Sequence, residues 1–233
     1  MKHFLFLTLF LSAPVFSQVS FISQGEAKIL YPCNVLESIP REKEEREMIS
    51  FFEKGRKELD ERGIILRYIR SETSDELTLK YRSKGNFSVD ETIYRALSAS
   101  PRGEFKCEED VNYGPSYSYS CSFKAPGSEL LPEHADLARM VRVQLPDLNN
   151  LRRVDVASTS WKLKMTPAQA QKSPLTKKPS IEVWKFRDVC LLEVSGKYQA
   201  PVDARAALSF LEGLVNARPS QVQGNKTGLA LGI

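Results

Sequence analysis

The fold of this chain is decided by residues 63–82, GIILRYIRSETSDELTLKYR, which hold two strand-like runs around a polar turn. Residues 64–70 are rich in β-branched and aromatic side chains, which favour a strand. In the second run, apolar and polar side chains alternate, with Leu77, Leu79 and Tyr81 on one face and Thr78, Lys80 and Arg82 on the other. The stretch therefore predicts an antiparallel hairpin with one apolar and one basic face.

The N-terminal segment has a different character. Lys2 and His3 precede an apolar run over residues 4–11, and small residues follow up to Ser17. This is the pattern of a secretory signal peptide, so we predict a signal peptide over residues 1–17 and an exported protein, either periplasmic or secreted. Because this is the single long apolar run, we expect no transmembrane segment after signal cleavage.

The composition of the chain argues against some classes of protein and indicates how many domains to expect. The chain has 233 residues, 33 Lys and Arg against 29 Asp and Glu, and 42% hydrophobic residues. A charge balance this even argues against a dedicated nucleic-acid binder, and the apolar content argues against disorder. We predict one domain over residues 18–217 and a loose C-terminal tail over 218–233, where Gly, Gln, Ser and Asn accumulate. No sequence pattern specifies an oligomeric state.

Four cysteines in an exported chain favour disulfides over a metal site or a catalytic thiol. Residues 105–111 and 117–124 both alternate apolar and polar side chains, and they flank a turn at Gly114. A hairpin centred there brings Cys107 directly opposite Cys121, so we predict a Cys107–Cys121 disulfide, with Cys33 and Cys190 as the remaining pair. The alternative is that these residues are thiols buried in a core.

The rest of the chain is assigned from periodicity. Apolar residues three to four apart in a Glu-, Lys- and Arg-rich stretch predict an amphipathic helix over residues 40–62, ending at Gly63. We predict further helices over 89–98, 132–145 and 201–216, strands over 154–165, 181–187 and 189–198, and a loop over 166–179. Trp161 and Trp184 are expected to pack in the core or on the outside of a sheet.

Several predicted strands carry ordered charges on one face. These charged faces contain Lys80 and Arg82, then Lys106, Glu108 and Asp110, and finally Glu193, Ser195 and Lys197. In a half-exposed sheet such faces meet water. In the alternative architecture the sheet closes into a barrel with helices outside and charges inside, where basic groups hold a polyanion and carboxylates hold a divalent cation.

A family resemblance favours the barrel. The hairpin of residues 63–82 resembles paired segments of the CYTH superfamily, the triphosphate tunnel fold of class IV adenylate cyclases and thiamine triphosphatases. Three further segments are similar to strands of that tunnel: QGEAK at 24–28, FKCEEDV at 105–111 and LLEVSGKY at 191–198. The resemblance covers most of the chain between residues 23 and 198.

The resemblance implies an α+β fold built on a closed or nearly closed antiparallel barrel of eight strands flanked by helices. It also implies triphosphate hydrolysis or cyclisation, with basic side chains on the phosphates and carboxylates on Mg²⁺ or Mn²⁺. The corresponding phosphate-binding candidates are Lys28, Arg67, Lys80, Arg82, Lys106 and Lys197. The candidate metal ligands are Glu26, Glu108, Asp110 and Glu193.

The sequence also departs from the family pattern. Gln24 stands where the family has a glutamate, and an amide is a poorer ligand for a hard cation. Ile69 stands where the pattern has an arginine, and Arg70 falls on the opposite face from Arg67 unless a bulge intervenes. We therefore expect a divergent tunnel that binds a phosphorylated or polyanionic small molecule, with residual triphosphate hydrolysis and no assigned catalytic residue. The alternative is a non-catalytic secreted or envelope protein with an interaction or structural role on the same barrel.

Overall fold

The computed structural model describes residue 22 and residues 24–55, 57–85, 88–114, 116–186, 189–199, 204–220 and 226–232. The predicted signal peptide, residues 1–17, lies outside this part. In chain order the elements are β1 (Gln24–Tyr31), the short 3-10 helix η1 (Cys33–Ser38), β2 (Arg41–Glu53), α1 (Glu58–Glu61), β3 (Ile64–Ser71), β4 (Asp75–Ser83), α2 (Glu91–Ser98), β5 (Glu104–Asn112), β6 (Ser116–Pro126), α3 (Pro132–Met140), β7 (Arg152–Leu163), α4 (Pro167–Gln171), β8 (Ser180–Phe186), β9 (Val189–Gln199), α5 (Ala204–Leu214) and α6 (Lys226–Leu231).

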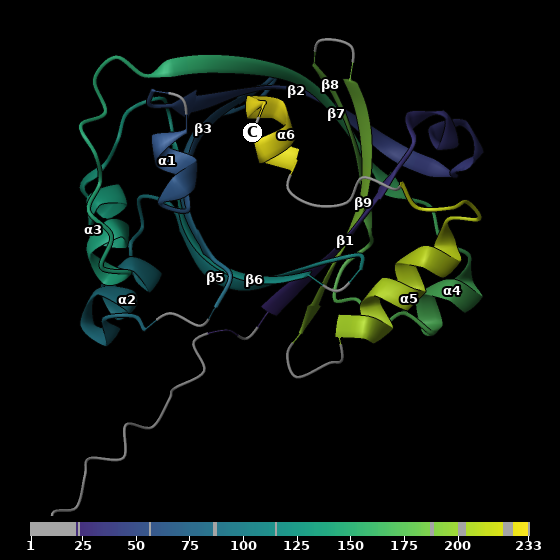
Figure 1. Cartoon of the computed structure of the whole chain (residues 1–233). Helices are drawn as coiled ribbons and strands as arrows, with labels where there is room; N and C mark the ends of the chain where they lie inside the picture. Colours follow the sequence, from purple (N-terminus) through teal and green to yellow (C-terminus); the bar gives the residue numbers. More distant parts are fainter. Residues whose placement is uncertain are drawn as a thin grey trace, which may run out of the picture.

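The strands form one closed barrel in the order β1-β5-β6-β4-β3-β2-β7-β8-β9, and β9 pairs back onto β1 (Figure 1). The predicted closed barrel flanked by helices is confirmed. Two details differ from the expectation: the described residues contribute nine strands, and β1 runs parallel to β5. The sheet is therefore mixed, although the other neighbouring pairs in the ring are antiparallel.

Both predicted hairpins are present. In β3 and β4 Leu66 pairs with Leu79, and in β5 and β6 Cys107 pairs with Cys121. The predicted disulfides Cys107–Cys121 and Cys33–Cys190 are both formed. The alternation of β4 divides the wall as expected: Leu77 and Leu79 are buried on the outside, while Thr78, Lys80 and Arg82 line the interior.

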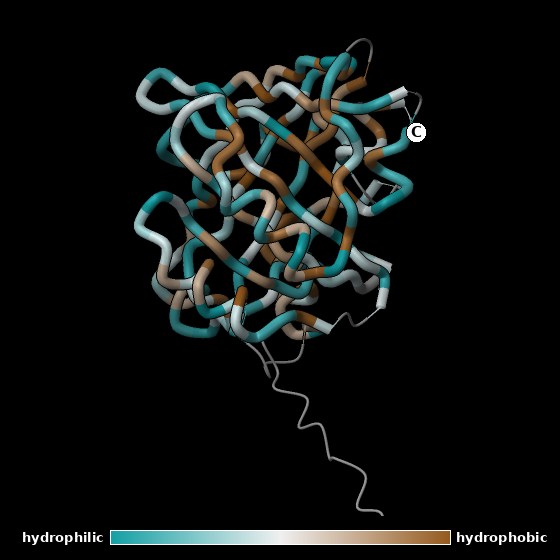
Figure 2. The backbone as a smooth tube through the Cα atoms, turned by 90° about the vertical axis from the view of Figure 1, so that its left-hand side faces the viewer, coloured by the Kyte–Doolittle hydropathy of each residue, from teal (hydrophilic) through white to brown (hydrophobic). Residues whose placement is uncertain are grey.

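Helices cover the apolar outer face of the barrel on two sides. Leu97 of α2 and Leu137 of α3 pack with Leu79 and Phe123, and Leu211 of α5 packs on the outer face of β1 and β9. Figure 2 shows the apolar residues concentrated along the strands, with hydrophilic residues at the turns. Because the helices bury the outer face, the polar faces of β4 and β5 are directed into the barrel.

The predicted helix over residues 40–62 is wrong for most of its length. Residues 41–53 form β2, which pairs with β3 on one side and β7 on the other, and α1 occupies only Glu58–Glu61. Glu53 connects the two elements, because its carboxylate accepts hydrogen bonds from the backbone N–H of Lys54, Leu59 and Asp60 at 2.8, 2.7 and 3.2 Å. Pairing with β7 along the Glu- and Lys-rich start of β2, and with both β3 and β7 from Glu47 to Phe52, outweighs the helical preference of this sequence.

The C-terminal segment also differs from the expected loose tail. Residues 226–231 form α6, which lies within the ring of strands when the barrel is viewed along its axis (Figure 1). Its residues Ala230 and Leu231 are buried with Ile49 and Ile65 of the barrel wall. Elsewhere the predicted helices over 89–98, 132–145 and 201–216 are present in shorter form, and the loop over 166–179 contains the five-residue α4. No helix in the described part of the chain is long and apolar enough to cross a membrane.

Candidate functional site

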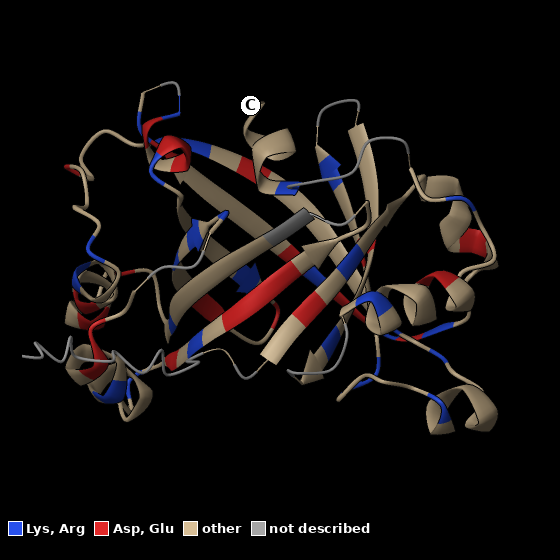
Figure 3. Cartoon of the chain, turned by 60° about the horizontal axis from the view of Figure 1, so that its bottom comes forward, with Lys and Arg blue, Asp and Glu red and all other residues tan. Residues whose placement is uncertain are grey.

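The interior of the barrel is a charged cavity of about 850 Å³. Each of the predicted phosphate and metal residues lines it: Glu26, Lys28, Arg67, Lys80, Arg82, Lys106, Glu108, Asp110, Glu193 and Lys197. Figure 3 shows acidic and basic residues along the strands that cross the barrel. The β-strand alternation thus brings residues from both halves of the sequence into one enclosed space.

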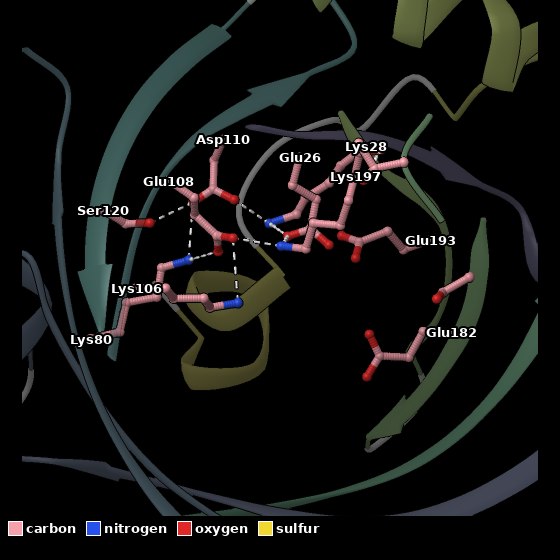
Figure 4. A network of polar contacts seen from close by, with 12 residues as sticks. Glu26, Lys28, Lys80, Lys106, Glu108, Asp110, Ser120, Glu182, Glu193 and Lys197 are labelled. Carbon is pink, nitrogen blue, oxygen red and sulfur yellow. Dashed lines mark hydrogen bonds and ion pairs between the residues drawn. The ribbon is translucent and has the colours of Figure 1, made fainter. Parts of the chain in front are cut away.

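An acidic cluster formed by Glu26, Glu108 and Asp110 lies at one side of the cavity (Figure 4). One carboxylate oxygen from each residue lies within 4.8 Å of the others. The parallel pairing of β1 with β5 makes this possible, because it places Glu26 beside Asp110 in the register. Ser120 of β6 donates a hydrogen bond of 3.1 Å to Asp110 and fixes its orientation.

Four lysines surround this acidic cluster. Their ammonium nitrogens form the following salt bridges: Lys28 with Asp110 (2.5 Å) and Glu26 (2.9 Å), Lys80 with Asp110 (3.0 Å) and Glu108 (3.4 Å), Lys197 with Glu108 (2.5 Å) and Glu26 (3.1 Å), and Lys106 with Glu108 (3.3 Å). Such mutual contacts satisfy the buried charges, which would otherwise be very costly to remove from water.

The protonation states follow from this pairing. Burial alone would raise the pKa of Asp110, but Lys28 and Lys80 outweigh burial and hold that pKa well below its usual range. Burial alone would also raise the pKa of Glu108, but the surrounding lysines outweigh burial and lower that pKa. The pKa of Lys28 is raised because Asp110 and Glu26 outweigh burial, whereas burial prevails at Lys80 and lowers its pKa. The carboxylates of the cluster are therefore ionised at neutral pH.

Arg67 and Arg82 differ from the lysines, because neither forms a salt bridge with any described residue. The Nε atom of Arg82 and the hydroxyl of Thr78 are buried without a hydrogen-bond partner in the described part of the chain. Both residues line the cavity, on β4. Arg70 lies on the opposite face of β3 from Arg67, as the alternation of a regular strand predicts, since Arg67 and Ile69 line the cavity while Arg70 is exposed. Arg82 and Thr78 provide unsatisfied donors for an anion, and Arg67 adds a second guanidinium group in the cavity.

A second acidic pair lies on β8 and β9, apart from the acidic cluster (Figure 4). Glu182 and Glu193 are direct partners across these strands, and both form salt bridges with Lys226 of α6. The predicted metal ligand Glu193 is therefore inside the cavity, paired with an ammonium group. It is not one of the three carboxylates that converge in the acidic cluster.

Sequence reasoning missed Glu182, Trp184 and Lys226. The alternation of β8 carried a signal for the first two, because Ile181 and Val183 are buried on the opposite face. The expectation that Trp184 packs in a core is confirmed, since it is 2% exposed and clusters with Ile49 and Phe51, and its ring also lines the cavity. Trp161 packs at the outer core. Lys226 carried no comparable signal, since nothing in residues 218–233 suggests an inward-facing helix.

The acidic cluster fits a hard divalent cation in donor type, because three ionised carboxylates supply oxygen ligands. Gln24, in the place of the first glutamate, is exposed at the start of β1 and does not line the cavity. The surrounding lysines already satisfy the three carboxylates. A metal ion there would have to displace ammonium groups, which would then be free to contact an anion.

Comparisons with known proteins support the architecture. No protein-family model matches the chain, and no curated protein matches it. A solved structure from Hippeastrum, described as a candidate adenylyl cyclase with a dominant triphosphatase activity, superposes with a TM-score of 0.52 at 10% identity, over 89% of this chain and 94% of that one. A candidate adenylate cyclase from Bacillus halodurans gives a TM-score of 0.50 at 12% identity, over 89% and 98%. At such identities the matches establish the fold.

Proposed function

We propose that this chain, which has the CYTH-like tunnel fold, binds a phosphorylated or otherwise polyanionic small molecule inside its barrel, together with a divalent cation. The enclosed cavity lined by basic side chains supports this proposal. One of the two similar structures is described as having a dominant triphosphatase activity, which favours a phosphorylated ligand for this chain. The proposal includes residual triphosphate hydrolysis as a secondary activity.

The observation that carries the proposal is the unsatisfied state of Arg82. A buried guanidinium nitrogen without a partner is costly, and a phosphate oxygen is the acceptor that best matches its geometry. The hydroxyl of Thr78, four residues earlier on the same strand face, is also buried without a hydrogen-bond partner in the described part of the chain. A polyphosphate lying along β4 would place acceptor oxygens beside both donors, and Arg67 would add a second charge-assisted contact.

The acidic cluster has a different role in the proposal. Glu26, Glu108 and Asp110 would hold Mg²⁺ or Mn²⁺, and the cation would supply Lewis-acid polarisation of a bound phosphate. The ammonium groups of Lys28 and Lys80 would then turn from the carboxylates to the phosphate oxygens. In this arrangement the residues exchange partners when the ligand enters, and no charge is left unpaired in the cavity.

The two disulfides bear on where the protein acts. Cys33–Cys190 and Cys107–Cys121 are expected to persist in an oxidising compartment, which supports the proposal that the protein is exported.

Calorimetric titration of the folded protein with tripolyphosphate tests the proposal, with and without Mg²⁺ or Mn²⁺. We expect saturable binding that Arg82→Gln weakens about tenfold, which corresponds to about 1.4 kcal/mol. Arg95→Gln is the matched control, because Arg95 is exposed on α2 and pairs with Glu91 of the same helix. Phosphate release from tripolyphosphate in the same samples measures the residual hydrolysis.

The opposite result would favour the non-catalytic role. If neither tripolyphosphate nor a nucleoside triphosphate produces heat or a thermal shift, with or without metal, the proposal of polyanion binding is wrong. An interaction or structural role on the same barrel would then be the better assignment, because the acidic cluster and its lysines can stabilise the fold without any ligand.

A further inference from the structure

The side of the cavity formed by β8 and β9 holds an ammonium group in a cage made by Glu182, Glu193 and Trp184. The Nζ atom of Lys226 lies 2.9 Å from Glu193 Oε1, contacts Glu182 and lies 4.3 Å from the centre of the Trp184 ring. Two carboxylates and one indole face therefore surround a single positive charge. This combination of ion pairing and cation–π contact is typical of sites that recognise organic cations.

The backbone register makes a cation necessary at this place. Glu182 and Glu193 are directly opposite each other on β8 and β9, and like charges in that relation destabilise a sheet. Ser158 of β7 donates a hydrogen bond of 3.0 Å to Glu182, so the carboxylate is held in position from its other side. Glu193 is 6% exposed, which leaves little water to screen the repulsion.

The electrostatics of Lys226 agree with this geometry. Burial alone would lower its pKa, but Glu182 and Glu193 outweigh burial and raise that pKa above the ordinary value. The pKa of Glu182 is lowered, because Lys226 outweighs the opposing effect of burial. Lys226 and Glu182 therefore stay charged at neutral pH.

The lysine is supplied by a short, locally held element. The helix α6 has six residues, too few to be stable by itself in water. It is held by apolar contacts of Ala230 and Leu231 with the barrel wall and by a hydrogen bond of 3.3 Å from Arg152 to the carbonyl of Leu231. The cage, in contrast, belongs to β8 and β9 of the closed barrel, so it does not depend on α6 for its shape.

We propose that Glu182, Glu193 and Trp184 form a binding site for a primary ammonium group, and that Lys226 occupies this site in cis and competes with any amine ligand that reaches it. A diamine or polyamine has the chemistry that the site would take. The proposal concerns the opposite side of the cavity from Arg82 and does not depend on polyanion binding. Either proposal can fail without the other.

The chemistry of the cage favours a primary ammonium over the other cations. A divalent metal ion prefers about six oxygen ligands, and the indole ring supplies none. A quaternary ammonium has no N–H donor for the two carboxylates, whereas a primary ammonium has three. The observed occupant, a lysine side chain, is itself a primary alkylammonium.

Chemical rescue of the full chain tests the site. Lys226→Ala removes the propylammonium portion of the side chain and leaves Glu182 opposite Glu193 without their cation. We expect the thermal midpoint of this variant to fall by about 2–4 °C. Propylammonium should restore it in a saturable manner, while tetramethylammonium and Mg²⁺ at equal ionic strength should not. The wild-type protein should not respond, because its cage is filled.

Two controls make the result specific. Lys226→Met fills the same space without the charge, so propylammonium should not restore the thermal midpoint of this variant. The double variant Lys226→Ala, Glu182→Gln lacks one carboxylate of the cage, so it should not respond to propylammonium either. Putrescine, titrated calorimetrically, should bind Lys226→Ala at least about tenfold more tightly than the wild-type protein, since a competitor has been removed.

The proposal is overturned if folded Lys226→Ala shows no response to propylammonium, or if tetramethylammonium or Mg²⁺ restores stability equally well. If this variant does not fold, its refolding yield is measured with and without propylammonium. A yield that rises with propylammonium supports the site, and an unchanged yield overturns it.

Discussion

Lys28 and Asp110 join the two parallel strands of the barrel, with Lys28 Nζ 2.5 Å from Asp110 Oδ1 inside the cavity. Asp110 is 2% exposed, forms a second salt bridge with Lys80 and accepts a hydrogen bond from Ser120. This one carboxylate therefore connects β5 to β1 and β4 through salt bridges and to β6 through a hydrogen bond. The same residue is a ligand in the acidic cluster, so the stability of the fold and the proposed chemistry share it.

Asp110→Asn should lower the free energy of unfolding at pH 7 by about 3 kcal/mol, because two buried ammonium groups lose their partner. The substitution should also change how the free energy of unfolding depends on pH in acid. The folded-state pKa of Asp110 lies well below the unfolded value, so its stabilisation is present above about pH 4 and is lost as pH falls toward the folded-state pKa. Urea unfolding of the variant should therefore depend less on pH below 4 than unfolding of the wild-type protein. Glu129→Gln, at an exposed position, is the control. Parallel curves for Asp110→Asn and wild type would show that Asp110 carries no such linkage.

Arg67 and Arg70 offer a matched pair on one strand, since Arg67 lines the cavity and Arg70 is exposed outside it. Arg67→Gln should weaken tripolyphosphate binding about tenfold through loss of a charge-assisted contact, while Arg70→Gln should leave it unchanged. Calorimetry at two salt concentrations measures both. Equal losses in the two variants would point to a general effect of net charge and would contradict a binding site inside the barrel.

Glu108 and Glu109 provide a second pair of neighbours on opposite faces of β5. Glu108 belongs to the acidic cluster, whereas Glu109 accepts a hydrogen bond of 2.9 Å from Tyr198. Glu108→Gln should reduce Mn²⁺ affinity by tenfold or more, because one ionised oxygen ligand is removed, and Glu109→Gln should not. The paramagnetic resonance signal of free Mn²⁺ reports the bound fraction. Unaltered binding by Glu108→Gln would place the metal elsewhere.

The two disulfides should differ in their effect on stability. In the chain-entropy model the Cys107–Cys121 link, with a sequence separation of 14, stabilises by about 3 kcal/mol, and the Cys33–Cys190 link, with a separation of 157, by about 5 kcal/mol. Paired Cys→Ser variants and urea unfolding test this order. Peptide mapping without reductant should recover both links, and a Cys33–Cys107 peptide would contradict the hairpin register.

The barrel wall was largely predictable where strands alternate cleanly. In β4 and β5 the period of two separates an outer apolar face from an inner charged face, and each candidate residue on those faces lines the cavity. The family resemblance then supplied what local pattern cannot, namely that these faces meet across a closed space. The parallel pairing of β1 with β5 was not predicted, because register between distant segments depends on the whole ring.

Two segments were misjudged for physical reasons. The start of β2 is rich in Glu and Lys, residues with good helix propensity, and its strand form depends on partners in β7 that lie more than 100 residues away. The helix α6 is too short to show a period and is stable only inside the barrel. Tertiary contacts, absent from any local pattern, decide both segments.

The position of β1 between β5 and β9 also sets an order of assembly during synthesis. The first strand of the barrel finds its antiparallel neighbour only when residues 189–199 have been made, so the ring stays open through most of translation. Such long-range pairing makes folding slow, and open strand edges are exposed to other chains meanwhile. A chain arrested before β9 would carry the other eight of the nine strands found among the described residues and still have no closed barrel around the cavity.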